Sequence, residues 1–84
     1  MNLLSIADQA RKPELSLEDK LQEMRRLGKP RLSFMTDGWC ATIDMHVAVS
    51  GTSCEVRSDF DHKTPSAAIN LCTERVFEML QRLK

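Results

Sequence analysis

Residues 39–47 alternate strictly between apolar and polar side chains, and this period of two restricts them to an extended strand. A helix would scatter the same apolar residues around its axis, whereas a strand places them all on one side. The apolar side consists of Trp39, Ala41, Ile43, Met45 and Val47. The pattern therefore predicts a strand in an antiparallel sheet that is covered on one face and open to water on the other.

Shorter segments on either side alternate in the same way. Residues 31–35 place Leu32 and Phe34 on one face, and a tight Thr36-Asp37-Gly38 turn connects them to residues 39–47. Residues 54–60 follow a second turn and separate into an apolar set (Cys54, Val56, Phe60) and a polar set (Glu55, Arg57, Asp59). The three segments predict an antiparallel meander, with Phe34, Phe60, Phe77 and Trp39 in the core.

Two helices are predicted around this meander. Residues 16–27 begin with Ser16 as N-cap and end where Gly28 can occupy the C′ position, and they carry an apolar stripe of Leu17, Leu21, Met24 and Leu27. Residues 65–83 begin with Thr64 as N-cap and Pro65 at N1. Their stripe comprises Ala68, Ile69, Cys72, Val76, Met79, Leu80 and Leu83.

The order α-β-β-β-α predicts an α+β fold, a two-layer sandwich with both helices on one face of the meander. The chain has 84 residues, which leaves room for one domain, expected at residues 14–84. Residues 1–13 form an N-terminal arm, either a short docked helix or a frayed end, that stops at Pro13. The residues expected to be buried together are Trp39, Ile43, Met45, Val56, Leu21, Met24, Cys72, Val76 and Leu80.

The cysteines and the absence of targeting signals favour a cytoplasmic protein. Cys40, Cys54 and Cys72 are odd in number and have no CxxC spacing, which indicates free thiols in a reducing compartment. Cys40 is expected to be the accessible one, since it falls on the polar side of its strand. No apolar run reaches the ~18 residues of a membrane span, and no signal peptide is evident.

Carboxylates and imidazoles gather around the strands without forming a recognisable catalytic or metal motif. These residues are Asp44, His46, Asp59, Asp61 and His62, and they could bind an ion. A solvated strand face and a polar helix entry explain them with fewer assumptions. A Cys40–His46 dyad is excluded, because six residues of continuous strand span roughly 20 Å. We therefore expect no enzyme, no metal and no cofactor.

The charge balance argues against a protein that depends on phosphate contacts. Twelve basic and twelve acidic residues give a net charge of zero. The basic residues nevertheless concentrate at one corner, which comprises Arg25, Arg26, Lys29 and Arg31, with Arg11 and Lys12 as further candidates. Nucleic-acid binding at this corner remains the alternative to protein binding.

The meander leaves two edge strands, and an edge strand can pair with another chain. Lys29, Pro30 and Arg31 protect the first strand, whereas residues 54–60 contain no proline or lysine. The predicted partner-binding residues are therefore Glu55, Arg57 and Asp59, together with the basic corner. The partner is expected to be a protein of unknown identity. A core this small also favours a homodimer, through that third strand or by exchange of the arm.

Two resemblances accompany these predictions. The α-β-β-β-α order over residues 16–83 resembles the double-stranded-RNA-binding domain, although the chain lacks that family's lysine-rich helix start and long first loop. Gly38-Trp39, the strand end Glu55-Val56-Arg57-Ser58 and the helix start Thr64-Pro65-Ser66-Ala67-Ala68 resemble small accessory proteins of tailed bacteriophages, including inhibitors of host defences such as anti-CRISPR proteins. The second resemblance implies a compact stoichiometric binder that acts inside a bacterial cell.

Overall fold

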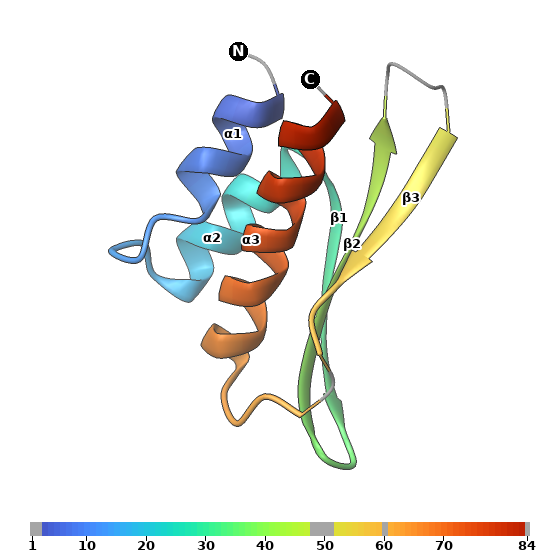
Figure 1. The fold of residues 1–84 in the computed structure, drawn as a ribbon. Coiled ribbons are helices and arrows are strands. Elements are labelled where there is room, and N and C mark those ends of the chain that lie inside the picture. Colours follow the sequence, from blue (N-terminus) through green and yellow to red (C-terminus); the bar gives the residue numbers. More distant parts are fainter. Residues whose placement is uncertain (1–2, 48–51, 60, 84) are drawn as a thin grey trace.

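Three helices pack on one face of a three-stranded antiparallel sheet (Figure 1). The computed structural model describes residues 3–47, 52–59 and 61–83. The elements are α1 (Leu3–Ala10), α2 (Leu17–Arg25), β1 (Gly28–Met35), β2 (Gly38–Val47), β3 (Thr52–Arg57) and α3 (Pro65–Leu83). The predicted α+β sandwich with a meander sheet is confirmed, and α1 is added to its helical layer.

The register of the sheet matches the alternation in the sequence. Strand β2 lies between β1 and β3, and Ile43 has Pro30 and Val56 as its cross-strand partners. Ile43 and Met45 are fully buried beneath the helices. A shift by one residue would have exposed them, so the predicted face of β2 is confirmed.

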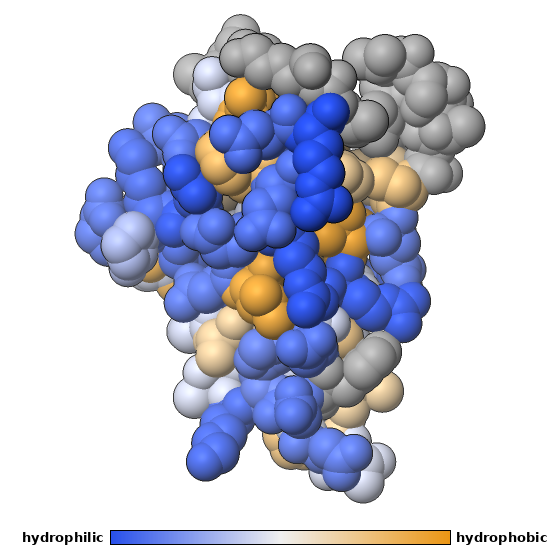
Figure 2. Space-filling view, in the orientation of Figure 1, coloured by the Kyte–Doolittle hydropathy of each residue, from blue (hydrophilic) through white to orange (hydrophobic). Residues whose placement is uncertain are grey.

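The core contains most of the predicted residues and extends into α1. Ile43, Met45, Met24, Cys72, Val76 and Leu80 are buried, whereas Leu21, Trp39 and Val56 are partly buried against them. Ile6, Ala7 and Ala10 of α1 join the same cluster. In the view of Figure 2, hydrophilic residues cover most of the described surface and the apolar residues appear in separate patches.

Helix α2 is shorter and β1 longer than the sequence predicts. The Ser16 hydroxyl accepts a hydrogen bond from the Asp19 N–H, as expected of an N-cap, but the helix ends at Arg25. Gly28 is the first residue of β1 and pairs with Met45. A Cβ atom at Gly28 would clash with the Asp44 carbonyl oxygen. Gly28 therefore allows two backbones to approach closely, and the prediction that it ends a helix is wrong.

The second correction concerns the phenylalanines. Phe34 is 70% exposed, and its ring contacts Trp39 edge-on at 5.1 Å between centroids. The β1–β2 hairpin extends past the first turn of α3, so its tip is left uncovered by the helices that the structure describes (Figure 1). Phe77 is partly buried against the core. Strand β3 ends at Arg57, and the predicted core residue Phe60 lies outside the described residues.

Lys20 is a buried cation that joins α2 to the end of α1. Its Nζ donates hydrogen bonds to the Ala10 carbonyl at 3.0 Å and to the Lys12 carbonyl at 2.6 Å. These carbonyls lie at the C-terminal end of α1 and just after it, where carbonyl groups have no N–H donor within the helix. Burial lowers the pKa of Lys20 from its ordinary value.

Replacing Lys20 with methionine should destabilise the protein by about 1–3 kcal/mol. Methionine retains the apolar stem but removes the Lys20 hydrogen bond from the Ala10 carbonyl and from the Lys12 carbonyl, of which the second still accepts from the Leu15 N–H. Urea unfolding followed by circular dichroism measures the loss. Lys63→Met changes an exposed lysine and should stay within about 0.5 kcal/mol of the parent protein. Equal midpoints for the two variants would show that the Lys20 hydrogen bonds add no stability.

Candidate functional site

The face of the sheet that the helices leave uncovered carries most of the predicted partner-binding residues. The alternation within each strand places Lys29, Arg31, Ser33, Met35, Thr42, Asp44, Glu55 and Arg57 on this open face. Figure 1 shows the helices gathered on the opposite side. We call these residues the open face from here on.

An ion-pair network crosses the three strands of the open face. The Arg31 guanidinium lies 2.9 Å from a Glu55 carboxylate oxygen and 3.5 Å from an Asp44 oxygen. Arg57 pairs with the other oxygen of Glu55, and this hydrogen bond holds the pKa of Glu55 below its ordinary value. Exposed pairs of this kind add little stability, and the Arg31 and Arg57 side chains remain about half exposed beside the carboxylates.

Met35 adds an apolar end to the open face. It is 43% exposed at the last position of β1, where the hairpin turns. Its neighbour Phe34 points to the other side of the sheet. The open face therefore combines charges of both signs with one exposed thioether side chain.

The basic corner does not form a single cluster. Arg25 and Lys29 line a shallow hollow of about 390 Å³ with Gly28 and Pro30. Arg26 pairs with Glu23 at 3.1 Å. Arg31 instead belongs to the ion-pair network of the open face, because β1 turns its side chain away from the helices.

Asp59 lies beyond the end of β3 rather than beside Glu55 and Arg57. Its carboxylate accepts a hydrogen bond from Arg75 of α3 at 3.1 Å. The same guanidinium donates to the Arg57 carbonyl at 2.8 Å. Arg75 therefore fastens the outer edge of β3 to α3, a link that the spacing of residues in the sequence does not reveal.

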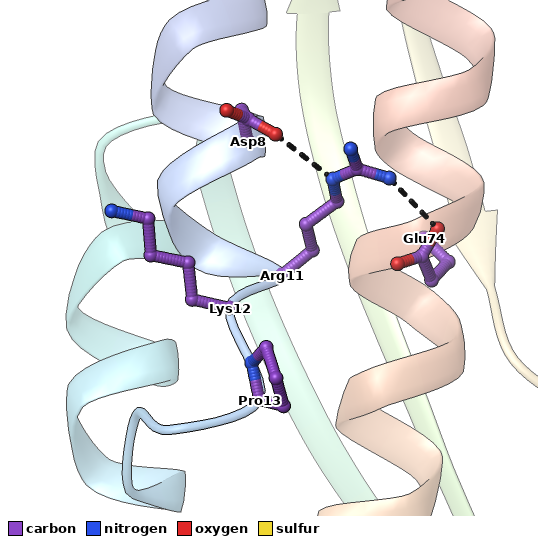
Figure 3. Close-up of a pocket in the computed structure, with 5 residues that line it drawn as sticks. All are labelled: Asp8, Arg11, Lys12, Pro13 and Glu74. Carbon is purple, nitrogen blue, oxygen red and sulfur yellow. Dashed lines mark hydrogen bonds and ion pairs between the residues drawn. The ribbon is translucent and has the colours of Figure 1, made fainter.

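Arg11 and Lys12 also lie apart from the basic corner, beside α3. The Arg11 guanidinium donates to Asp8 at 3.0 Å and to Glu74 at 3.3 Å, and it stacks 3.7 Å from the centre of the Phe77 ring. These contacts border a hollow of about 260 Å³ in which Arg11 reaches from the end of α1 toward α3 (Figure 3). The hydrogen bond to Asp8 raises the pKa of Arg11. The arrangement holds α1 on α3.

The residues considered for ion binding have separate roles where the structure describes them. Asp44 belongs to the open-face network, and Asp59 pairs with Arg75. His62 exchanges backbone hydrogen bonds with Trp39, and its Nε2 atom is buried without a partner in the described part of the chain. The side chain of His46 lies outside the described residues. Within those residues, His, Cys, Asp and Glu side chains form no group of three or more that could hold a metal ion.

The exposure of the three cysteines contradicts the prediction that Cys40 is the accessible thiol. All three are free thiols, but Cys40 is buried at 5% exposure. It lies between Ser33 of β1 and the segment that follows β3, whose Ser58 N–H donates to the Ala41 carbonyl. Burial raises the pKa of Cys72 to about 12. Cys54 is half-buried, with its sulfur 3.7 Å from that of Met79.

Cys54 should therefore react first with a maleimide at neutral pH, and Cys72 last. Accessibility and thiolate formation both limit the rate, and both are lowest at Cys72. Mass spectrometry of timed samples identifies the labelled residue. Cys54→Ser should remove the fastest phase, and fastest labelling of Cys40 would contradict its burial.

Among the described residues, no helix combines the length and the apolar character needed to cross a bilayer. The comparisons with known proteins found no matching family model, no matching curated protein and no matching solved structure.

Proposed function

We propose that the protein is a non-enzymatic binding module that acts by protein–protein contact and uses the open face as its contact surface. The observation that carries the proposal is Arg31, which bridges Glu55 and Asp44 on a sheet face that none of the described helices covers. Arginine and methionine are enriched at protein interfaces. A guanidinium already oriented by carboxylates loses less conformational entropy when a partner binds.

The charges of the open face favour a protein partner over a nucleic acid. Lys29, Arg31 and Arg57 alternate with Asp44 and Glu55, so the surface presents both signs. A phosphate backbone would meet repulsion as well as attraction there. The resemblance to phage accessory proteins agrees with a stoichiometric binder in the bacterial cytoplasm. Such a binder needs no catalytic group of its own.

The test begins with capture from a bacterial lysate and ends with a purified pair. Proteins retained by the tagged chain are identified by mass spectrometry, and each candidate is then purified and titrated calorimetrically. Arg31→Ala combined with Met35→Ala should weaken binding at least about tenfold, as expected for central interface residues. Glu18→Ala changes an exposed residue of α2 and should leave the affinity unchanged. Equal affinities for both variants would contradict the proposal.

Nucleic-acid binding is the second candidate, and the hollow between Arg25 and Lys29 is the observation that favours it. Two cations beside one depression suit a phosphate group. A gel shift at two salt concentrations tests this candidate, since phosphate-dependent binding falls steeply with salt. Arg25→Gln with Lys29→Gln should abolish the shift. No shift by the parent protein at low salt would reject the candidate.

A further inference from the structure

The hydrogen-bond direction in β2 shows which backbone groups of β1 face outward. The Trp39 N–H donates to the His62 carbonyl at 2.8 Å, and the Ser58 N–H donates to the Ala41 carbonyl at 2.9 Å. Trp39 and Ala41 therefore direct their backbone groups toward the β3 side of the sheet. In an antiparallel ladder the intervening Cys40 must direct its groups toward β1.

The backbone N–H and C=O groups that point outward from β1 belong to the residues that alternate with those hydrogen-bonded to β2. Cys40 faces Ser33, and Thr42 faces Arg31. The N–H and C=O of Leu32 and Phe34 consequently point away from the sheet, along its edge. Pro30 has the same orientation, so its missing N–H costs no bond to β2. Pro30 protects the first half of β1, and the half from Arg31 to Met35 remains open.

The other edge of the sheet is less suitable for pairing. The carbonyl of Arg57 at the end of β3 already accepts the Arg75 hydrogen bond at 2.8 Å. Strand β3 has six residues, compared with eight in β1. The structure therefore favours β1 over the third strand, which the sequence suggested as the pairing edge.

We propose that two copies of this chain pair through the outer edges of β1, antiparallel and centred on Ser33. This inference rests on the proposed function as a protein-binding module and names one partner, a second copy. In this register Leu32 faces the partner's Phe34, and the symmetry produces the same pair again. Ser33 lies opposite its own counterpart. The two sheets become one continuous sheet with three strands from each copy.

The choice of this register follows from which residues of the two β1 strands would face each other. Centring on Ser33 sets Arg31 opposite the partner's Met35, so no like charges face each other between the two strands. Centring on Leu32 instead would set Phe34 opposite the partner's Pro30, which has no N–H to donate. The Ser33-centred register therefore satisfies the outward backbone groups of Leu32 and Phe34.

The exposure of Phe34 also agrees with this pairing. Its ring is 70% exposed on the helix side of the sheet, at the edge. In the dimer it would pack on the partner's Leu32, because directly opposed residues of paired strands point to the same face. The helices of both copies then lie on one side, and the two open faces join into one surface on the other.

Sedimentation equilibrium from low to high micromolar concentration tests the dimer. The parent protein should approach twice the 9.6 kDa chain mass. Phe34→Pro removes an outward N–H and no bond to β2, so it should yield a folded monomer by mass and circular dichroism. Glu18→Ala changes an exposed residue of α2, away from the β1 edge, and should remain dimeric.

A charge exchange tests the register, including the case in which Phe34→Pro fails to fold. Met35→Arg should weaken the dimer by about tenfold, because arginine then faces the partner's Arg31 in two symmetric places. Adding Arg31→Glu should restore it, because each new arginine then faces a glutamate. No weakening, or no restoration, would overturn this register.

The dimer and the proposed function fail independently. A parent protein that stays at 9.6 kDa at high micromolar concentration overturns the dimer. A dimer that persists in a folded Phe34→Pro variant overturns the β1 edge. The proposed function is judged by the affinity for a different protein, which is measured for the folded Phe34→Pro monomer as well as for the parent protein.

Discussion

Ile43→Ala should destabilise the protein by about 2–5 kcal/mol. Ile43 is fully buried at the centre of β2, where Pro30 and Val56 flank it and the helices cover it. Truncation removes apolar contact area and leaves a cavity that a close-packed interior fills only partly. Small domains have about 5–15 kcal/mol of stability in total, so this loss is a large fraction of it.

Urea unfolding followed by the fluorescence of Trp39, the single tryptophan, measures this effect. Thr42→Ala changes the adjacent residue, which faces the open side of the sheet, and serves as the matched control. We expect the control to stay within about 1 kcal/mol of the parent protein. If both variants unfolded at the same urea concentration, Ile43 would not lie in the core.

Gly38→Ala should cost at least about 1–3 kcal/mol from backbone conformation alone. Gly38 has a φ of +152°, a region that residues with a Cβ rarely adopt. The new Cβ would also lie 2.5 Å from the His62 carbonyl oxygen, which belongs to backbone. The segment around His62 must move away, and this movement strains the hydrogen bonds between His62 and Trp39.

The melting temperature by circular dichroism tests this prediction, with Asp37→Ala as control. Asp37 is the exposed neighbour in the same turn, so its replacement changes composition without requiring a positive φ. We expect a clear drop for Gly38→Ala and a small change for Asp37→Ala. A Gly38→Ala protein as stable as the parent would mean that the chain relaxes here without cost.

The predicted functional residues were only partly brought together by folding. Arg31, Glu55 and Arg57 meet on the open face because their side chains point to the same side of the sheet and Arg31 reaches across β2 to Glu55. Asp59 is separated from them because the chain leaves the ladder after Arg57 and α3 supplies Arg75. Such a contact between distant segments has no periodic signal in the sequence.

The sequence by itself determined the order of the elements and the buried face of β2. Period-two alternation and helix caps are local properties, and water exclusion then forces apolar stripes onto one side of the sheet. Only the tertiary structure decided that α1 completes the core, that Phe34 is exposed and that Cys40 is buried. These outcomes depend on where the helices end above the sheet and on how the segments on either side of β2 pack against it, and both are set by contacts between segments far apart in the chain.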